Sequence, residues 1–177
     1  MISKSKLLNM VLSAMFLAIA MVLPFLTGQI PQIGNAMCPM HIPVILCGFI
    51  CGPQYALCVG LIAPILRFFL FGMPTIMPKG VAMSFELATY GLVSGILYRV
   101  LPRKKIYIYV SLVIAMIAGR VIWGLVQLTL MGLGKSSFSW AAFVSGAFLN
   151  AIPGIIIQIV IIPVLVILLA KQMEQNK

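Results

Sequence analysis

Long runs of apolar residues, separated by short polar or charged breaks, make up almost the whole chain. Runs of this length with few charges inside them are typical of helices that cross a lipid bilayer. The pattern predicts an all-α integral membrane protein, a six-transmembrane-helix bundle that forms a single membrane domain over residues 1–177. The predicted spans cover residues 7–26, 39–52, 54–71, 80–101, 106–133 and 140–170.

The second run is the weakest of the six. Its 14 residues rise only about 21 Å as a helix, whereas the hydrocarbon core is about 30 Å thick. The sequence therefore leaves an alternative in which Gly52 and Pro53 form a kink in one long helix, which reduces the bundle to five spans.

The positive charges outside the spans favour six helices over five. With six spans and a cytoplasmic N-terminus, two of these charges lie outside and eight lie inside, which is the bias of natural membrane proteins. Five spans give four inside against six outside, so we predict six spans with both termini cytoplasmic. The outside pair is Lys79 and Lys135, and the inside set is Lys4, Lys6, Arg99, Arg103, Lys104, Lys105, Lys171 and Lys177.

Composition supports a multi-pass protein of the cell (cytoplasmic) membrane. Hydrophobic residues make up 63% and charged residues 8% of the chain, and the mean hydropathy is +1.18. The first run follows two lysines and imitates a signal peptide, but it is too long for one. The net charge of +10 is explained by the tendency of membrane proteins to carry Lys and Arg on the cytoplasmic side, so no nucleic-acid partner is needed.

The four cysteines form no CxxC pair, and we predict that they are packing residues, with no metal site, disulfide or cofactor. They are Cys38, Cys47, Cys51 and Cys58.

Three charged residues stand inside the apolar runs, namely Arg67, Glu86 and Arg120. Each costs about 2.5 to 3.5 kcal/mol at the centre of a membrane helix before any pairing. Counting helical rise places all three about 20 Å above the inner edge of the membrane. Two positive charges and one negative charge leave one positive charge over, which predicts a site for an anion. The alternative is that one arginine pairs with Glu86 only to pin helices together.

Other polar residues lie on the same helical faces or at the same depth. Tyr90 aligns with Glu86, whereas Trp123 and Gln127 align with Arg120. The further candidates for this substrate-binding pocket are Asn150, Lys79 at the outer end of a span, and His41. His41 ends the outer loop of residues 27–42, a candidate lid, where a lone histidine is more often a surface or capping residue.

Catalysis is not expected. The chain has no aspartate, one histidine and one membrane-embedded acid, which is too little for general acid and base roles. The rivals to a substrate-binding role for the buried polar residues are a membrane assembly or structural protein and a stand-alone secondary transporter. A secondary transporter is expected to carry several membrane acids.

Short strings in the chain point to a known family. They are Met40-His41-Ile42-Pro43, Pro64-Ile65-Leu66-Arg67, Phe85-Glu86-Leu87-Ala88-Thr89-Tyr90-Gly91, and the AxxxA spacing of Ala14 and Ala18. With six short spans and a long outer loop, the chain resembles the S-components, or substrate-binding subunits, of energy-coupling factor (ECF) vitamin transporters, and in particular the pantothenate-type branch.

The resemblance implies a binding subunit of an ATP-driven importer. Such a subunit captures a vitamin from outside and then joins a transmembrane coupling protein (EcfT type) and two cytoplasmic ATPases (EcfA type) in the lipid bilayer. It is thought to topple to release its cargo inside. Ala14 and Ala18 are then expected to contact the coupling protein.

The buried charges suggest the kind of substrate. The spare positive charge suits the carboxylate of pantothenate. The side chains expected to bind its carboxylate, hydroxyl and amide groups are Arg67, Arg120, Gln127 and Asn150. The alternative substrates are a folate and a queuosine precursor. A neutral pyridoxine-type vitamer is a further alternative if Glu86 neutralises an arginine.

Overall fold

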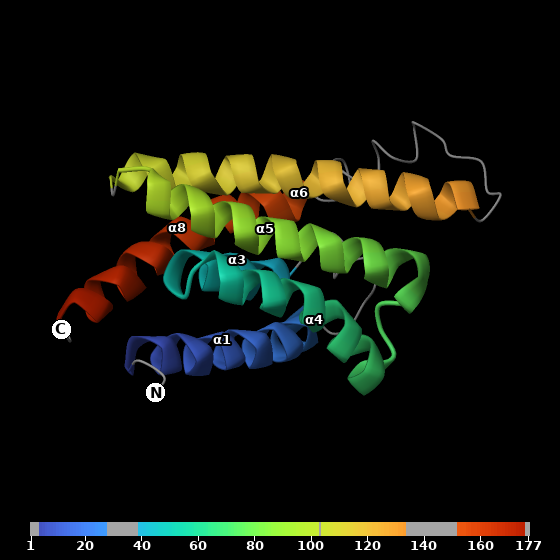
Figure 1. The fold of residues 1–177 in the computed structure, drawn as a ribbon, viewed down its shortest axis with the longest axis horizontal. Coiled ribbons are helices and arrows are strands. Elements are labelled where there is room, and N and C mark those ends of the chain that lie inside the picture. Colours follow the sequence, from blue (N-terminus) through green and yellow to red (C-terminus); the bar gives the residue numbers. More distant parts are fainter. Residues whose placement is uncertain (1–3, 28–38, 103, 134–151, 176–177) are drawn as a thin grey trace.

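A computed structural model describes residues 4–27, 39–102, 104–133 and 152–175 of the protein. These residues form six α-helices and two short helical segments, and the long helices run side by side along one direction (Figure 1). The elements are α1 (Lys4–Val22), η1 (Leu23–Thr27), α3 (His41–Ile50), α4 (Pro53–Phe71), η2 (Ile76–Gly80), α5 (Val81–Val100), α6 (Lys105–Leu133) and α8 (Ile152–Gln175). The predicted span 140–170 begins, with Trp140, outside the described residues.

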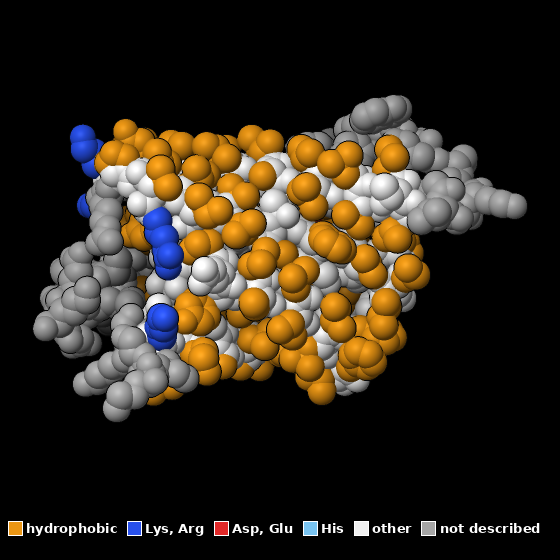
Figure 2. Space-filling model, viewed as in Figure 1, with side chains coloured by type: hydrophobic (Ala, Val, Ile, Leu, Met, Phe, Trp, Pro, Cys, Tyr) orange, Lys and Arg blue, Asp and Glu red, His pale blue; other side chains and the backbone are white. Residues whose placement is uncertain are grey.

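Four helical segments are long and apolar enough to cross a membrane: Lys6–Phe25, Pro53–Phe71, Ile76–Val100 and Lys105–Leu130. Two shorter apolar helices, His41–Ile50 and Gly154–Leu169, complete the described bundle. Apolar side chains cover the face in Figure 2, and the Lys and Arg side chains visible there gather at its left end. That end also carries both chain termini and the α5–α6 connection in Figure 1. The bundle is therefore built as a multi-pass membrane protein.

Helix α3 is short because it lies inside the bundle. Eight of its residues are buried, and it contacts α1, α4, α5 and α8. A helix that is apolar on all sides is expected to be surrounded in this way. At ten residues it spans only about 15 Å, so its first residue, His41, lies within the protein.

The Gly52-Pro53 pair forms a turn between two helices, so the alternative of one kinked helix is wrong. Gly52 has φ 103°, which favours glycine, and Pro53 begins α4 at a position that needs no N–H donor. Helices α3 and α4 then pack against each other. The Arg99 side chain lies against Gly52, and its Nη2 is 3.5 Å from the carbonyl oxygen of Cys51.

Small residues bring α5 close to its neighbours. A Cβ added at Gly91 would lie 2.7 Å from the Cβ of Ala56, and one at Gly60 would lie 2.5 Å from the backbone nitrogen of Ala88. These distances leave no room for a side chain, so α4 and α5 touch backbone to backbone. The pair is a closely packed part of the fold.

Candidate functional site

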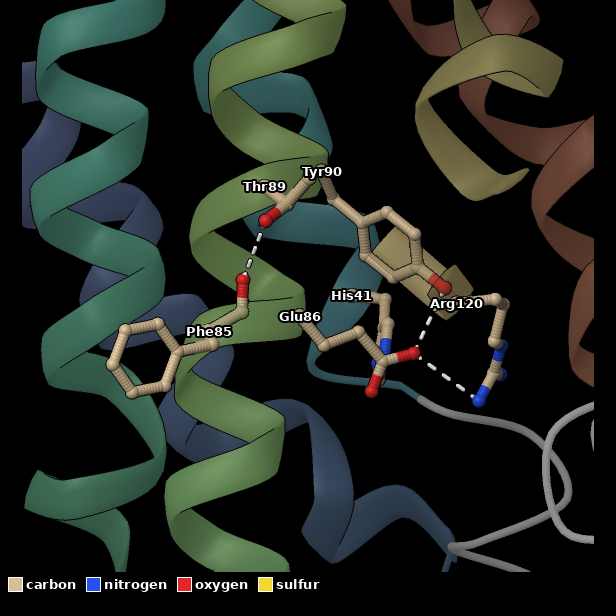
Figure 3. A network of polar contacts seen from close by, with 6 residues as sticks. All are labelled: His41, Phe85, Glu86, Thr89, Tyr90 and Arg120. Atoms are coloured by element: carbon tan, nitrogen blue, oxygen red, sulfur yellow. Dashed lines mark hydrogen bonds and ion pairs between the residues drawn. The ribbon is translucent and has the colours of Figure 1, made fainter. Parts of the chain in front are cut away.

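Glu86 on α5 is the centre of a buried polar cluster. Its carboxylate is 2% exposed, and its Oε1 accepts a 2.9 Å hydrogen bond from the hydroxyl of Tyr90. Nη1 of Arg120, on α6, lies 3.1 Å from the same oxygen. Figure 3 shows these side chains converging from two helices. The four-residue spacing on α5 places Glu86 and Tyr90 on one face.

His41 joins the cluster from α3. Its Nε2 is 3.7 Å from Oε1 of Glu86, and its ring centroid lies 5.2 Å from that of Tyr90. The side chain is 2% exposed, so the expectation of a surface or capping histidine is wrong. Neither ring nitrogen has a hydrogen-bond partner among the described residues. Nε2 faces the Glu86 carboxylate, so Nδ1 is the buried atom of this ring that still needs a partner.

Gly119 was missed by the sequence reasoning, although it precedes Arg120. The ring of Tyr90 lies directly against its Cα, where any Cβ would collide with the ring. This glycine leaves room for the tyrosine ring against α6, while the hydroxyl donates to Glu86. A glycine beside a membrane arginine was the available signal.

The cluster binds three helices together through charge. Removing an ion pair from water costs several kcal/mol per ion. This cost is recovered only if the two charges are close and well oriented and if their other polar atoms also form hydrogen bonds. Glu86 meets this condition with a close arginine and a tyrosine hydroxyl. Helices α3, α5 and α6 are thus held around one carboxylate.

Arg67 on α4 contacts a different set of residues. It is 6% exposed, its Nη1 donates a 2.9 Å hydrogen bond to the carbonyl of Met21, and it lies over two phenylalanine rings. Both ion pairs among the described residues involve Glu86 and neither involves Arg67. The structure brings Glu86 together with Arg120 and not with Arg67.

The remaining candidates lie at different levels of burial. Gln127 is 7% exposed, and its Oε1 has no hydrogen-bond partner in the described part of the chain. Trp123 is half-buried and Lys79, on η2, is exposed. Asn150 lies outside the described residues, as do residues 28–38 of the candidate lid.

Arg120 also borders a crevice of about 110 Å³ between α6 and α8. Its other walls are apolar and consist of Val113, Met116, Ile117, Ile155 and Ile159. The guanidinium therefore stands between a polar cluster and an apolar space. No group of three His, Cys, Asp or Glu residues in the described ranges is arranged to hold a metal ion.

A buried polar cluster in an apolar bundle suits a transport subunit, and the family model described as "ECF transporter, substrate-specific component" matches residues 8–166. The chain belongs to that family. No curated protein and no solved structure matches it. The resemblance inferred from the short strings is therefore confirmed at the level of the S-component family. S-components are substrate-binding transport subunits and not enzymes.

S-components bind a small molecule and work with a coupling protein and ATPases. In this S-component, Ala14 and Ala18 lie on an exposed face of α1. The same spacing occurs at Gly48 and Gly52, from α3 to the N-cap of α4, and at Gly91 and Gly95 on α5. These pairs behave differently, because Gly48 and Gly91 face each other inside the protein. Of these three motifs, the one on α1 is exposed and can meet another protein.

Proposed function

We propose that this S-component captures a small anionic vitamin such as pantothenate from outside the cell membrane and delivers it to an ATP-driven importer. One observation carries the proposal: a hydrogen-bonding, charged cluster lies buried where three apolar helices meet. His41 Nε2 faces Glu86, but Nδ1 of His41 and Oε1 of Gln127 have no hydrogen-bond partner among the described residues. Helix pinning does not need these buried polar atoms, whereas a polar ligand can bond to them.

Arginine supports an anion as the substrate. Arg120 has a planar guanidinium suited to paired hydrogen bonds with a carboxylate. Glu86 occupies its Nη1, and the guanidinium also borders the crevice between α6 and α8. Gln127 and His41 offer further polar atoms for the hydroxyl and amide groups of such a vitamin.

A neutral polar vitamer of the pyridoxine type is the second candidate, and a specific distance favours it. Glu86 lies 3.1 Å from Arg120, so this pair has no net charge when His41 is neutral. A site with no net charge and several hydrogen-bonding groups suits a ligand that carries hydroxyls and no carboxylate.

The proposal includes six spans, cytoplasmic termini and a partner face. Both chain termini lie at one end of the bundle in Figure 1, as six spans require. The exposed Ala14 and Ala18 allow close approach of a second helix. We propose that this face of α1 meets the coupling protein, which joins two cytoplasmic ATPases.

Mass spectrometry of small molecules released from the purified, denatured protein identifies the ligand most directly. A carboxylate-bearing vitamin supports the first candidate, and a pyridoxine-type vitamer supports the second. The rival of a structural membrane protein predicts that no vitamin is released and that none binds on titration.

Variants of Arg120 test the site itself. Removing a charged partner from a buried pair costs about 2 to 5 kcal/mol, or roughly 30-fold to several thousand-fold in affinity. We therefore expect Arg120→Ala to weaken pantothenate binding at least 30-fold and Arg120→Lys to restore part of the loss. Arg99→Ala is the matched control, because Arg99 lies in the last turn of α5, away from the cluster. This variant should bind pantothenate normally. Unchanged affinity in Arg120→Ala would rule out the anion site.

A further inference from the structure

Arg67 carries a buried positive charge that no carboxylate of the described chain neutralises. Its side chain is 6% exposed, and Glu86 is paired with Arg120 and His41 instead. A buried charge without compensation is strongly unfavourable. The compensation for Arg67 comes from the C-terminal end of α1.

The first contact is a backbone carbonyl in the last turn of α1. Nη1 of Arg67 donates a 2.9 Å hydrogen bond to the carbonyl oxygen of Met21, next to the end of α1. The carbonyls in the last turn of an α-helix have no regular partner within the helix and are often satisfied by a bond to the N–H three residues on. Residue 24 is Pro24, which has no N–H. The guanidinium supplies the donor that proline lacks.

The second contact is an aromatic cage. The guanidinium carbon of Arg67 lies 5.6 Å from the ring centre of Phe25, on η1, and 5.5 Å from that of Phe71, on α4. The two rings meet edge to face with centroids 4.9 Å apart. A cation over aromatic faces is attracted to them, and the attraction grows when water is excluded. Arg67 is thus held by both sides of the seam between α1 and α4.

We propose that Arg67 is a positioning residue that fixes the C-terminal end of α1 to α4. Helix α4 is in turn locked to α5 by the close approach of Gly60 to Ala88. Arg67 therefore sets the angle of α1, which carries the exposed alanines, relative to the helix that carries Glu86. This inference rests on the proposed function only where it concerns the coupling protein.

The competing role for Arg67 is direct binding of the anionic substrate. A substrate ligand and a positioning residue differ in their dependence on Pro24. If Arg67 serves the carbonyl of Met21, giving residue 24 an N–H should make the arginine less necessary. If Arg67 binds substrate, the change at residue 24 should make no difference.

A double-mutant cycle on stability tests the contact without any ligand. The variants are Arg67→Met, Pro24→Ala and the double variant, each melted in detergent micelles. We expect Arg67→Met to lower the melting temperature, and the double variant to lose clearly less than the sum of its parts. Arg99→Met combined with Pro24→Ala is the matched control, and its effects should add. Additive effects for Arg67 and Pro24 would overturn the proposed contact.

The same variants test the functional consequence. We expect Arg67→Met to leave the dissociation constant for pantothenate within about threefold, while it weakens the complex with the coupling protein by about tenfold or more. Pro24→Ala should restore part of that complex. A loss of pantothenate affinity of 30-fold or more, unaffected by Pro24→Ala, would instead make Arg67 a substrate ligand.

Failure of the proposed function gives a different result. If the parent protein binds no vitamin and no coupling protein, the proposed function is wrong, and the melting cycle still decides the role of Arg67. Should Arg67→Met not insert into the membrane, Arg67→Lys replaces it. Lysine keeps the charge and a donor but loses the planar group, so it should show the same pattern with a smaller effect.

Discussion

Gly119→Ala is expected to disturb the polar cluster through one contact. The three atoms nearest to the added methyl all belong to the ring of Tyr90, and they lie closer than van der Waals contact allows. Tyr90 is 1% exposed and bonded to Glu86, so its ring cannot move without losing that bond. Overpacking costs about 1 to 3 kcal/mol and the lost hydrogen bond about 0.5 to 1.5 kcal/mol. Alanine returns about 1 kcal/mol in helix propensity, which leaves a net loss of about 0.5 to 3.5 kcal/mol.

The measurement is the free energy of unfolding of the purified protein in mixed micelles, followed by circular dichroism. The matched control is the same Gly119→Ala change in a Tyr90→Leu background, where the ring is absent. There we expect no loss and a gain of up to about 1 kcal/mol, because only the helix propensity of alanine remains. Pantothenate titration of the same proteins reports whether moving Tyr90 also weakens binding.

Equal losses in both backgrounds would refute this reasoning. They would mean that Gly119 matters for a reason other than the tyrosine ring, and that the contact between α5 and α6 is not what holds Tyr90 toward Glu86. A gain in stability in the parent background would have the same meaning.

Three further predictions address other parts of the molecule. Glu86→Ala leaves Arg120 buried without its carboxylate and should cost about 3 to 5 kcal/mol of stability, whereas Glu86→Gln keeps an acceptor, should cost less, and should preserve or tighten binding of an anion; equal costs on denaturant titration would contradict this. Replacing Ala14 and Ala18 by Leu should leave binding by the isolated protein near normal but abolish transport and co-purification with a coupling protein; lost binding would place both alanines in internal packing. In a variant without native cysteines, a cysteine at position 135 should react with an impermeant thiol reagent in whole cells and one at position 104 should not, and the reverse pattern would reject the topology.

The positions of the helices were the part of the fold most accessible from the sequence. The run predicted at 54–71 corresponds to α4 at Pro53–Phe71, and the run at 80–101 corresponds to α5 at Val81–Val100. Apolar runs predict such helices well because a backbone in lipid has to satisfy its own hydrogen bonds. Proline and glycine at the run ends fix the boundaries to within a residue or two.

The partners of the buried charges were much less predictable. Depth along a helix follows from residue counting, so Glu86 and the two arginines were expected at one level. Residues at one depth still lie on different sides of a bundle, and only the packing decides which of them meet. Arg120 reaches Glu86, but Arg67 meets a carbonyl and two aromatic rings.

His41 shows how the length of one helix changes a site. A lone histidine at the end of a loop is usually near the surface, and the sequence was interpreted in that way. Helix α3 has only ten residues and is enclosed by its neighbours, so the loop end reaches into the protein. The short apolar run was itself the signal, because a run too short to span the membrane has at least one end inside it.

The small-residue motifs show what spacing alone leaves undecided. The same four-residue spacing occurs on α1, α3 and α5, but Gly48 and Gly91 lie so close that a Cβ would collide with the facing helix, whereas Ala14 and Ala18 are exposed. Glycine allows backbones to touch, which makes a permanent contact tight. Alanine keeps a methyl group and suits a shallower contact that forms and separates. A subunit that joins and leaves its coupling protein needs shallow alanine contacts on its outer surface and tight glycine contacts inside. This chain has the alanines on the exposed face of α1 and the glycines between its buried helices.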